Sequence, residues 1–318
     1  MTEPAVAILI PTFRRPDGLA RLLASLDRLT FTGGRAPRIS IVVVDNDADI
    51  APARGDGLAR ASRHPLDYVV EPVRGLSAAR NRALEQVPAD TRFIAFIDDD
   101  EWAEPQWLDA LLAVQAETGA EVVQGPVTPE FARPAPAWMT IGGYFEVGPF
   151  EAGDRLDFGA SGNCLIDWPK LAASGVRFDM AYNTSGGEDA DFFERLLALG
   201  WSIAAAPDAR AHELVPLERM TPAGVRRLEF RKGNTLGRLA LRSGAPRRIA
   251  ERAIKGVGHI AYGATEAVAF GLLVDGAAAR GMARVARGAG MLAAFLRLRS
   301  HYYGGRPSPH PGRAAGPV

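Results

Sequence analysis

The first hundred residues alternate between short apolar runs and segments in which apolar residues recur every three or four positions. The apolar runs occupy residues 6–10, 39–44, 68–70 and 93–97. Residues 17–29, with leucines at helical spacing, and residues 77–86 lie between these runs and predict helices. Short apolar strands that alternate with helices favour an α/β domain with a mainly parallel, Rossmann-like sheet covered on both faces.

The rest of the chain divides into a loop-rich middle and a helical end. Residues 125–150 are rich in Pro, Gly and aromatic side chains, which is typical of an irregular wall around a cleft. Strand, helix and strand patterns follow at residues 162–166, 189–199 and 201–205. We therefore predict three parts. They are an α/β domain at 1–220, a helical region at 221–304, and a disordered tail rich in Pro and Gly at 305–318.

Polar residues follow the apolar runs at the points where the strands should end. Thr12, Asp45 and Asp98 each stand at such a position. In open α/β sheets, ligands bind beyond the carboxyl ends of parallel strands, because the loops there meet along one edge. The pattern predicts that these three side chains converge on one ligand site.

The overall composition is ordinary, but the charge is divided unevenly along the chain. Of the 318 residues, 47% are hydrophobic, which suits one large domain or one domain with an appendage. The formal net charge is zero, yet residues 221–318 hold 17 Lys and Arg against 4 Asp and Glu, an excess of 13 that residues 1–220 balance. An acidic body suits a metal and substrate site. A basic end suits an anionic surface, such as nucleic acid or a phospholipid leaflet.

Cysteine usage and the first residues indicate the compartment. Cys164 is the single cysteine, which excludes a disulfide framework and a cysteine-based zinc site. This usage fits a reducing compartment such as the cytoplasm. Residues 1–10 do not have the basic start and long apolar core of a secretory signal, so we expect a cytoplasmic protein.

The basic end of the chain contains apolar stretches that are too short to span a membrane. Glu266 interrupts the stretch at 256–274, whereas a spanning helix needs roughly 18 apolar residues. Residues 267–274 and 288–296 lie beside arginines, a pattern typical of helices in the membrane interface. We expect peripheral contact with the inner face of the cell membrane. A helical bundle packed on the main domain, with a solvated basic face, is the alternative.

Four consecutive carboxylates, Asp98 to Glu101, follow the apolar run at 93–97. Such crowding is electrostatically unfavourable without a cation, and oxygen ligands of this kind prefer Mg²⁺ or Mn²⁺. A bound cation would bridge a diphosphate and neutralise the charge that develops as the diphosphate leaves. A solvated acidic loop is the alternative for an isolated tetrapeptide, but the position directly after a core strand favours a divalent-metal site.

Several motifs in one order resemble the nucleotide-sugar-binding half of family 2 glycosyltransferases, which have the GT-A fold. The motifs are Pro11-Thr12-Phe13-Arg14, Asp45-Asn46, residues 75–81, Asp98-Asp99-Asp100, Gly186-Gly187-Glu188-Asp189, His212 and residues 231–234. They span roughly residues 5–235. Within the family, the chain is similar to the ExoM-type enzymes of succinoglycan-like exopolysaccharide biosynthesis. The resemblance implies an inverting, metal-dependent hexosyltransferase.

The resemblance assigns the donor and metal sides of this site. It implies that the nucleotide sugar is bound by Pro11, Thr12, Arg14, Asp45, Arg80, Asp98 and Asp99. The Asp45 carboxylate would accept the uracil N3–H, and the two arginines would face the diphosphate or the base. Asp100 would bind the metal directly with Asp98, and His212 would be a further ligand. The alternatives are a solvated strand end for Asp45, an exposed helix position for Arg80 and a structural role for His212.

The motif Gly186-Gly187-Glu188-Asp189 supplies the base of the reaction. Two glycines let the backbone approach a substrate, and the carboxylates then open a helix whose N-terminus favours negative charge. Inversion in a single displacement needs a base that takes the proton of the acceptor hydroxyl. The family's matching Asp has that role, so the resemblance implies that Asp189 is the base. Glu188 would orient the loop or contact the acceptor, and helix capping is the alternative for Asp189.

The acceptor side has few markers in the sequence. Trp138, Tyr144 and Phe145 would stack on sugar faces or, alternatively, fill the wall of the cleft. Asn163 stands where the acceptor-side strand should begin, so we include it with Trp138 and Glu188 as a candidate acceptor contact.

These observations predict transfer of a hexose from a nucleotide sugar, with UDP-glucose as the family-led expectation, to a lipid-linked or oligosaccharide acceptor. A nucleotidyltransferase would show a Gly-rich phosphate loop after the first strand, where this chain has PTFRRP. An inactive nucleotide-sugar-binding protein would lose the metal carboxylates or the base, and both are present. Nucleic acid is a disfavoured partner because aromatic side chains are sparse among the C-terminal arginines.

Overall fold

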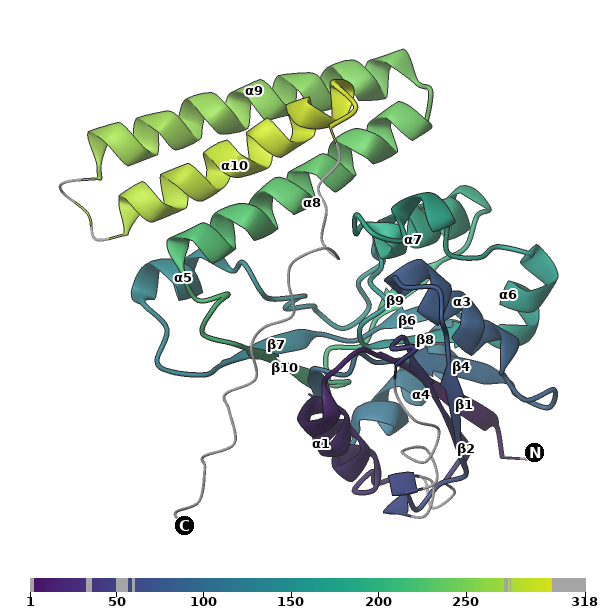
Figure 1. Cartoon of the computed structure of the whole chain (residues 1–318). Helices are drawn as coiled ribbons and strands as arrows, with labels where there is room; N and C mark the ends of the chain where they lie inside the picture. The colour runs from purple at the N-terminus through teal and green to yellow at the C-terminus, as the bar shows by residue number, and fades with distance from the viewer. Residues whose placement is uncertain are drawn as a thin grey trace, which may run out of the picture.

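The structure is a computed structural model that describes residues 3–32, 36–49, 57–58, 61–271, 274 and 276–298. It contains an α/β body and, beside it, a layer of three long helices, as Figure 1 shows. The N-terminal strand lies inside the body, while the chain leaves the body for the helical layer after β10 (Ala211–Val215).

The body is built on a seven-stranded sheet with the order β3-β2-β1-β4-β8-β6-β9. The strands are β1 Ala5–Thr12, β2 Arg38–Asp45, β3 Leu66–Val70, β4 Phe93–Phe96, β6 Val122–Gln124, β8 Cys164–Asp167 and β9 Ile203–Ala205. Strands β3, β2, β1 and β4 pair in parallel, as do β6 and β9, whereas β8 is antiparallel to both of its neighbours. The predicted mainly parallel sheet is confirmed.

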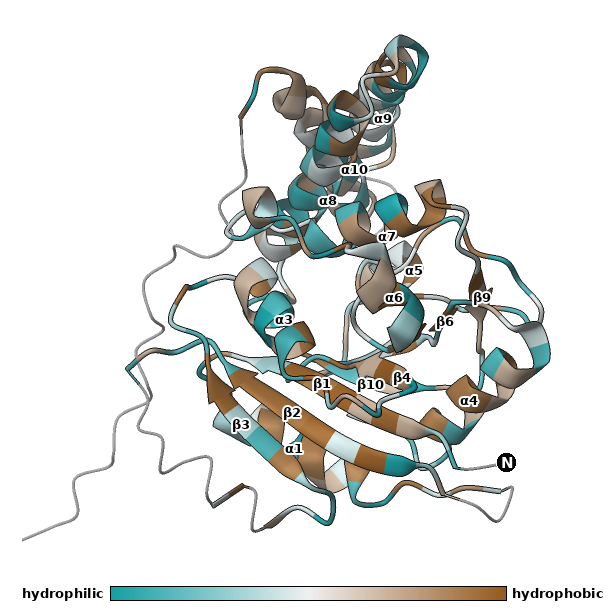
Figure 2. Ribbon diagram, turned by 90° about the vertical axis from the view of Figure 1, so that its right-hand side faces the viewer, coloured by the Kyte–Doolittle hydropathy of each residue, from teal (hydrophilic) through white to brown (hydrophobic). Residues whose placement is uncertain are grey.

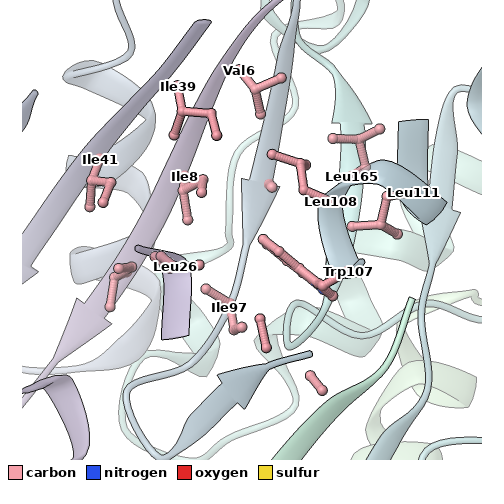
Figure 3. Packing of buried hydrophobic residues seen from close by; sticks show 14 of the residues in the cluster. Val6, Ile8, Leu26, Ile39, Ile41, Ile97, Trp107, Leu108, Leu111 and Leu165 are labelled. Atoms are coloured by element: carbon pink, nitrogen blue, oxygen red, sulfur yellow. The ribbon is translucent and has the colours of Figure 1, made fainter. Parts of the chain in front are cut away.

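Helices cover both faces of this sheet because each central strand is apolar on both sides. Along β1, Val6, Ile8 and Ile10 belong to one core, and Ala7 and Leu9 belong to the other. Figure 3 shows the first core, in which Trp107 and the leucines of α4 pack against the strands. The first face is covered by α1 Pro16–Leu26 and α4 Trp107–Thr118, and the second by α3 Leu76–Glu85, α6 Trp168–Ser174 and α7 Glu188–Ala198.

A second, three-stranded sheet with the order β5-β10-β7 lies beside the central sheet, below the helical layer in the view of Figure 1. Its other strands are β5 Glu101–Ala103 and β7 Val127–Phe131. Strand β10 is antiparallel to β5, and the pairing sets Glu213 opposite Glu101 and His212 opposite Trp102. This register decides which side chains of β10 face the site described below.

The three helices of the layer are α8 Pro222–Arg242, α9 Pro246–Ala269 and α10 Ala277–Phe295. Glycines let them approach closely, because a Cβ at Gly233 or Gly237 would stand 2.0 or 2.5 Å from a carbonyl oxygen of α10. Trp138 and Met139 of α5 (Ala137–Gly142) join Val225 and other side chains in a shared hydrophobic cluster. In Figures 1 and 2, α9 is the helix farthest from the sheet.

Three expectations need comment at this level. Residues 125–150 contain the short strand β7 and the short helix α5 between loops, two elements that the prediction of a loop-rich wall did not include. The predicted tail at 305–318 lies outside the described residues, as do residues 272, 273 and 275. Within the described part of the chain, no helix combines the length and the apolar character that crossing a membrane requires.

Candidate active site

A cavity of about 760 Å³ opens at the carboxyl end of β1 and the loop after β4. Its volume lies within the roughly 300–1,000 Å³ range of small-molecule sites. The ends of β1 and β4 and the first turns of α3 and α7 supply its walls, together with the side chains of β10, α8 and α10. The expected convergence of strand-end residues on one edge of the sheet therefore brings Thr12 and Asp98 to the same cavity.

Asp99 is held inside the protein by groups from the end of β1. Its Oδ2 accepts hydrogen bonds from the Thr12 hydroxyl at 2.8 Å and from the Phe13 amide at 3.2 Å. Arg15 Nη1 donates at 2.8 Å both to Asp99 Oδ1 and to Asp100 Oδ2. Burial raises the pKa of Asp99 to about 6, and the charge of Asp100 adds to this, against the hydrogen bonds and the charge of Arg15.

The two arginines after Phe13 have different surroundings. Arg14 adopts a positive φ of 53°, and its Nε donates to Asp47 Oδ2 at 2.5 Å, with Asp49 as a second partner. Arg14 is absent from the residues that line the cavity, whereas Arg15 lines it. The sequence motif predicted Arg14 as a ligand-binding residue. In the structure, Arg15 is the arginine that reaches the aspartate triplet at residues 98–100.

Asp45, which ends β2, and Asn46, which follows it, also have separate roles. Asp45 is buried; it accepts hydrogen bonds from the Tyr68 hydroxyl and from the Asp47 amide at 3.1 Å. Asn46 lines the cavity, and its Oδ1 accepts the Gly75 amide at 2.6 Å. Asp45 therefore lies behind the cavity wall, while Asn46 fixes the loop that opens α3.

Arg80 connects the aspartate triplet to the motif at residues 186–189. From α3, its Nη1 donates to Glu188 Oε1 at 2.5 Å and its Nη2 donates to Asp98 Oδ1 at 3.1 Å. The side chains of Arg80 and Glu188 are 3% and 5% exposed, whereas Asp98 is 32% exposed. Arg80 is thus neither a surface residue nor a group aimed only at a ligand, because it joins two carboxylates of the site.

The motif at residues 186–189 begins with two glycines that have positive φ. Gly186 and Gly187 have φ of 75° and 91°, and α7 begins at the next residue, Glu188. Asp189 lies in the first turn, lines the cavity, and accepts the Ala190 amide at 2.7 Å. Burial raises the pKa of Glu188, the charge of Asp189 raises it further, and Arg80 opposes both. Asp189 and the aspartate triplet thus line one cavity.

The helical region is part of this site. The cavity is lined by Leu228, Arg231, Lys232, Thr235 and Leu236 of α8 and by Arg287 of α10. Gly187 permits the contact with α8, since a Cβ there would stand 2.5 Å from Thr235 Oγ1. The predicted boundary at residue 220 therefore does not separate the site from the helices.

Strand β10 turns the predicted ligand His212 and the adjacent Glu213 to opposite sides. Glu213 lines the cavity, whereas His212 stacks on Trp102 and its Nε2 lies 3.0 Å from Glu104 Oε1. Successive residues of a strand point to opposite faces, so only one of the pair can face the triplet. The structure does not bring His212 together with Asp98 and Asp100, and sequence reasoning missed Glu213.

The predicted acceptor residues Trp138 and Asn163 are engaged elsewhere. Trp138 belongs to the hydrophobic cluster under the helical layer and contacts the residue Gly276 before α10. The Asn163 amide is buried; it accepts from Trp107 Nε1 at 2.6 Å and donates to the carbonyls of Pro126 and Ala209 at 2.7 Å. Both residues are outside the cavity lining, so Glu188 is the member of the predicted acceptor set that lines it.

The carboxylates that remain for a cation are Asp98 and Asp100. Both line the cavity, as does the more deeply buried Glu101, which accepts the Asp98 amide at 3.0 Å. Among the described residues, no three His, Cys, Asp or Glu side chains are arranged as a metal site. Two carboxylates still suit Mg²⁺ or Mn²⁺, because these ions are commonly held by one or two carboxylates together with substrate phosphates.

Comparisons with known proteins agree with this architecture. The model of glycosyl transferase family 2 matches residues 7–167, and the chain belongs to this family. The succinoglycan biosynthesis protein ExoM of Rhizobium meliloti is 37% identical over 235 residues, 74% of each protein. The putative glycosyltransferase EpsH of Bacillus subtilis is 30% identical over 35% of this chain and 30% of its own length. The resemblance to family 2 and to ExoM-type enzymes is confirmed.

Two solved structures show the same type of fold. S. aureus TarS 1–349 in complex with UDP-GlcNAc has a TM-score of 0.50 and 14% identity, covering 94% of this chain and 93% of that one. GalNAc-T7 with UDP, GalNAc and Mn²⁺ has a TM-score of 0.53 and 14% identity, covering 71% and 47%. The GT-A-type fold expected from the sequence is confirmed.

Proposed function

We propose that this glycosyltransferase moves a hexose, with UDP-glucose as the expected donor, onto a hydroxyl of a lipid-linked oligosaccharide, with inversion. The observation that carries the proposal is that Asp189 and the aspartate triplet line one cavity. The similarity to a succinoglycan biosynthesis protein over 74% of the chain supports a role in the assembly of an exopolysaccharide or another cell-surface glycan.

Asp189 is the proposed base. It would take the proton of the acceptor hydroxyl as that oxygen attacks the anomeric carbon. A bond between the acceptor oxygen and the anomeric carbon forms while the bond to the phosphate oxygen breaks, and the bonding pair leaves with the nucleoside diphosphate. Attack from the opposite face gives a β linkage from an α-linked donor. Asp189 lies in the first turn of α7, beside the N-terminal amides of that helix.

A divalent metal, Mn²⁺ or Mg²⁺, is part of the proposal, with Asp98 and Asp100 as its protein ligands. Arg15 supports this assignment, because a positive group already bridges Asp99 and Asp100. When bound, the ion would supply Lewis-acid stabilisation of the leaving diphosphate. The fold relative GalNAc-T7 was solved with Mn²⁺.

The nucleotide would lie against the wall formed by Pro11, Thr12, Phe13 and Asn46. Arg74 stands over the Phe13 ring at 4.1 Å, so a cation and an aromatic face border this part of the cavity. The Thr12 hydroxyl already donates to Asp99, so the nucleotide contacts would come mainly from the other side chains that line this wall.

Membrane contact is proposed for the outer face of α9. Ile254, Val257, Tyr262 and Val268 are exposed there, at intervals typical of one helix face. The flanking arginines that suggested the interface are engaged within the bundle, since Arg280 and Arg284 pair with Glu266 and Arg287 pairs with Glu229. We therefore place the proposed membrane contact on α9 rather than on residues 267–274 and 288–296. The exposed Arg247 of α9 would face anionic lipid at the cytoplasmic leaflet.

Sedimentation with vesicles tests this contact. Val257→Glu with Val268→Glu should abolish binding to vesicles that contain phosphatidylserine, because two charges would enter the apolar interface. Leu199→Glu is the control, since Leu199 is as exposed as Val257 but directly follows α7, away from α9. Equal binding by the double variant and the wild type would contradict the proposed contact.

Donor turnover tests the main proposal. Release of UDP from a panel of UDP- and GDP-sugars with Mn²⁺ should single out one donor, whereas pyrophosphate release from a nucleoside triphosphate would indicate a nucleotidyltransferase. Asp189→Asn should lower transfer about 10²–10⁴-fold and leave donor affinity within threefold, since a base acts on the acceptor proton. An equal loss of donor affinity would mean that Asp189 is structural.

A further inference from the structure

The wall of the cavity that faces the base motif is basic and comes from the helical layer. The cavity-facing residues of α8 recur every three or four positions, which is one face of a helix: Leu228, Arg231, Lys232, Thr235 and Leu236. Arg219 and Arg287 line the same cavity, and Arg219 pairs with Glu213. Arg219, Arg231, Lys232 and Arg287 thus form a basic wall of the cavity, and another wall carries the aspartate triplet.

Lys232 lies at the centre of this basic wall. Its Nζ donates to the neutral carbonyl of Tyr144 at 2.7 Å and lies 3.9 Å from Glu229 Oε1, which also pairs with Arg287. Burial lowers the pKa of Lys232, and the neighbouring arginines of this wall lower it further against the attraction of Glu229. Cations that repel one another inside a cavity are stabilised when an anion joins them.

The basic wall stands next to the base loop. A Cβ at Gly186 would lie 3.3 Å from Cδ of Arg231, and one at Gly187 would lie 2.5 Å from Oγ1 of Thr235. Asp189 follows two residues later and lines the same cavity. A group held by α8 is therefore beside the position where the acceptor hydroxyl must lose its proton.

We propose that Arg231 and Lys232 form an anion subsite for a phosphate or diphosphate group of the acceptor. Guanidinium and ammonium groups are the side chains that bind phosphate through charge-assisted hydrogen bonds. This inference rests on the proposed function, because a lipid-linked acceptor carries its sugar on such a group. Anchoring the charged group at α8 presents the attached sugar to Asp189, while the donor diphosphate remains at Asp98 and Asp100.

Binding of inorganic pyrophosphate to the full chain, in EDTA so that no metal contributes, tests the subsite. Isothermal titration should show that Arg231→Gln with Lys232→Met binds pyrophosphate about tenfold more weakly, or worse, than the wild type. Arg227→Gln is the matched control, because Arg227 is exposed on α8 and does not line the cavity. Unchanged affinity in the double variant would overturn the proposal. If the double variant does not fold, pyrophosphate affinity is measured for Lys232→Met alone, and an unchanged affinity would again overturn the proposal.

The source of the phosphate is decided by two further ligands. A short prenyl diphosphate should bind the wild type and lose about tenfold affinity in the double variant, and the matching prenyl alcohol should bind neither protein tightly. UDP with Mn²⁺ should change less than threefold. An equal loss for UDP would assign the cations to the donor and overturn the acceptor assignment. These are binding measurements, so they remain interpretable even where no sugar is transferred.

Discussion

Substituting Arg80 by Met tests whether the link between the two acidic motifs is needed for stability. The change leaves Glu188, whose side chain is 5% exposed, without the guanidinium that lies 2.5 Å from its Oε1. Its Oε2 is also buried, with no hydrogen-bond partner among the described residues. Removing one partner of a buried pair costs about 3–5 kcal/mol. The contact with the partly exposed Asp98 adds at most about 1 kcal/mol. We expect a loss of about 4 kcal/mol at pH 8.

The loss should depend on pH with a known sign. Burial and the charge of Asp189 raise the pKa of Glu188 even with Arg80 present. Without Arg80 the pKa rises further, so the folded variant binds a proton more tightly than its unfolded chain. Stability then falls as the pH rises from about 4.5, by up to about 1.4 kcal/mol per pH unit, until the new folded pKa is passed. The variant should therefore be closest to the wild type near pH 5.

Urea unfolding at pH 5 to 8 measures this effect on four proteins: the wild type, Arg80→Met, Glu188→Gln and the double variant. Glu188→Gln should restore much of the stability in the Arg80→Met background, because a neutral amide removes the buried charge. Arg82→Met is the control on the same helix, since Arg82 and its partner Glu85 are exposed, and it should stay within about 0.5 kcal/mol. A stability within 1 kcal/mol of the wild type at pH 8 for Arg80→Met, or no recovery in the double variant, would refute the reasoning.

Three other predictions concern the metal, the base loop and the body of the fold. Asp100→Ala should abolish Mn²⁺-dependent UDP binding in a titration, and unchanged Mn²⁺ affinity would exclude it as a ligand. Gly187→Ala should lower both the melting temperature and transfer, whereas Gly200→Ala, with a similar φ of 82° but open space around it, should show only the strain of about 1–2 kcal/mol. Equal effects would mean that contact with α8 is unimportant. Partial burial raises the pKa of Glu121, but hydrogen bonds from Lys170 and Ser202 outweigh it and lower that pKa to about 2. A lowered pKa stabilises above pH 4.5, so Glu121→Gln should lose about 3 kcal/mol in urea unfolding at pH 7, and the difference should shrink as the pH falls from 4.5 to 2.

The strands and the cavity edge could be predicted because they depend on local patterns. Runs such as residues 39–44 are apolar on both faces, which indicates a covered parallel strand, and parallel strands end at one edge. That is why Thr12, Asp45 and Asp98 were expected together; Thr12 and Asp98 line one cavity, whereas the buried Asp45 is outside its lining. The motif at residues 186–189 was also recognisable from a local pattern, because two glycines before carboxylates indicate a turn that opens a helix.

The orientation of single side chains could not be predicted, because it depends on contacts between distant segments. His212 and Glu213 are equally suited to a metal site in the sequence, and only the register of β10 against β5 turns Glu213 inward. The positive φ of Arg14 similarly decides that Arg15 reaches the triplet. Asn163 also stands at a suitable position, but its amide is occupied by Trp107 and two carbonyls.

The uneven charge of the chain has its explanation in the cavity. The basic end supplies Arg231 and Lys232 of α8 and Arg287 of α10 to the cavity, across from the carboxylates of the acidic body. The glycine pair at 186–187 sets how closely α8 approaches the base loop, because any side chain at 187 would meet Thr235. A donor and an acceptor that each carry a phosphate group match such a cavity better than a neutral sugar does. Each half of the sequence thus supplies one wall of the cavity.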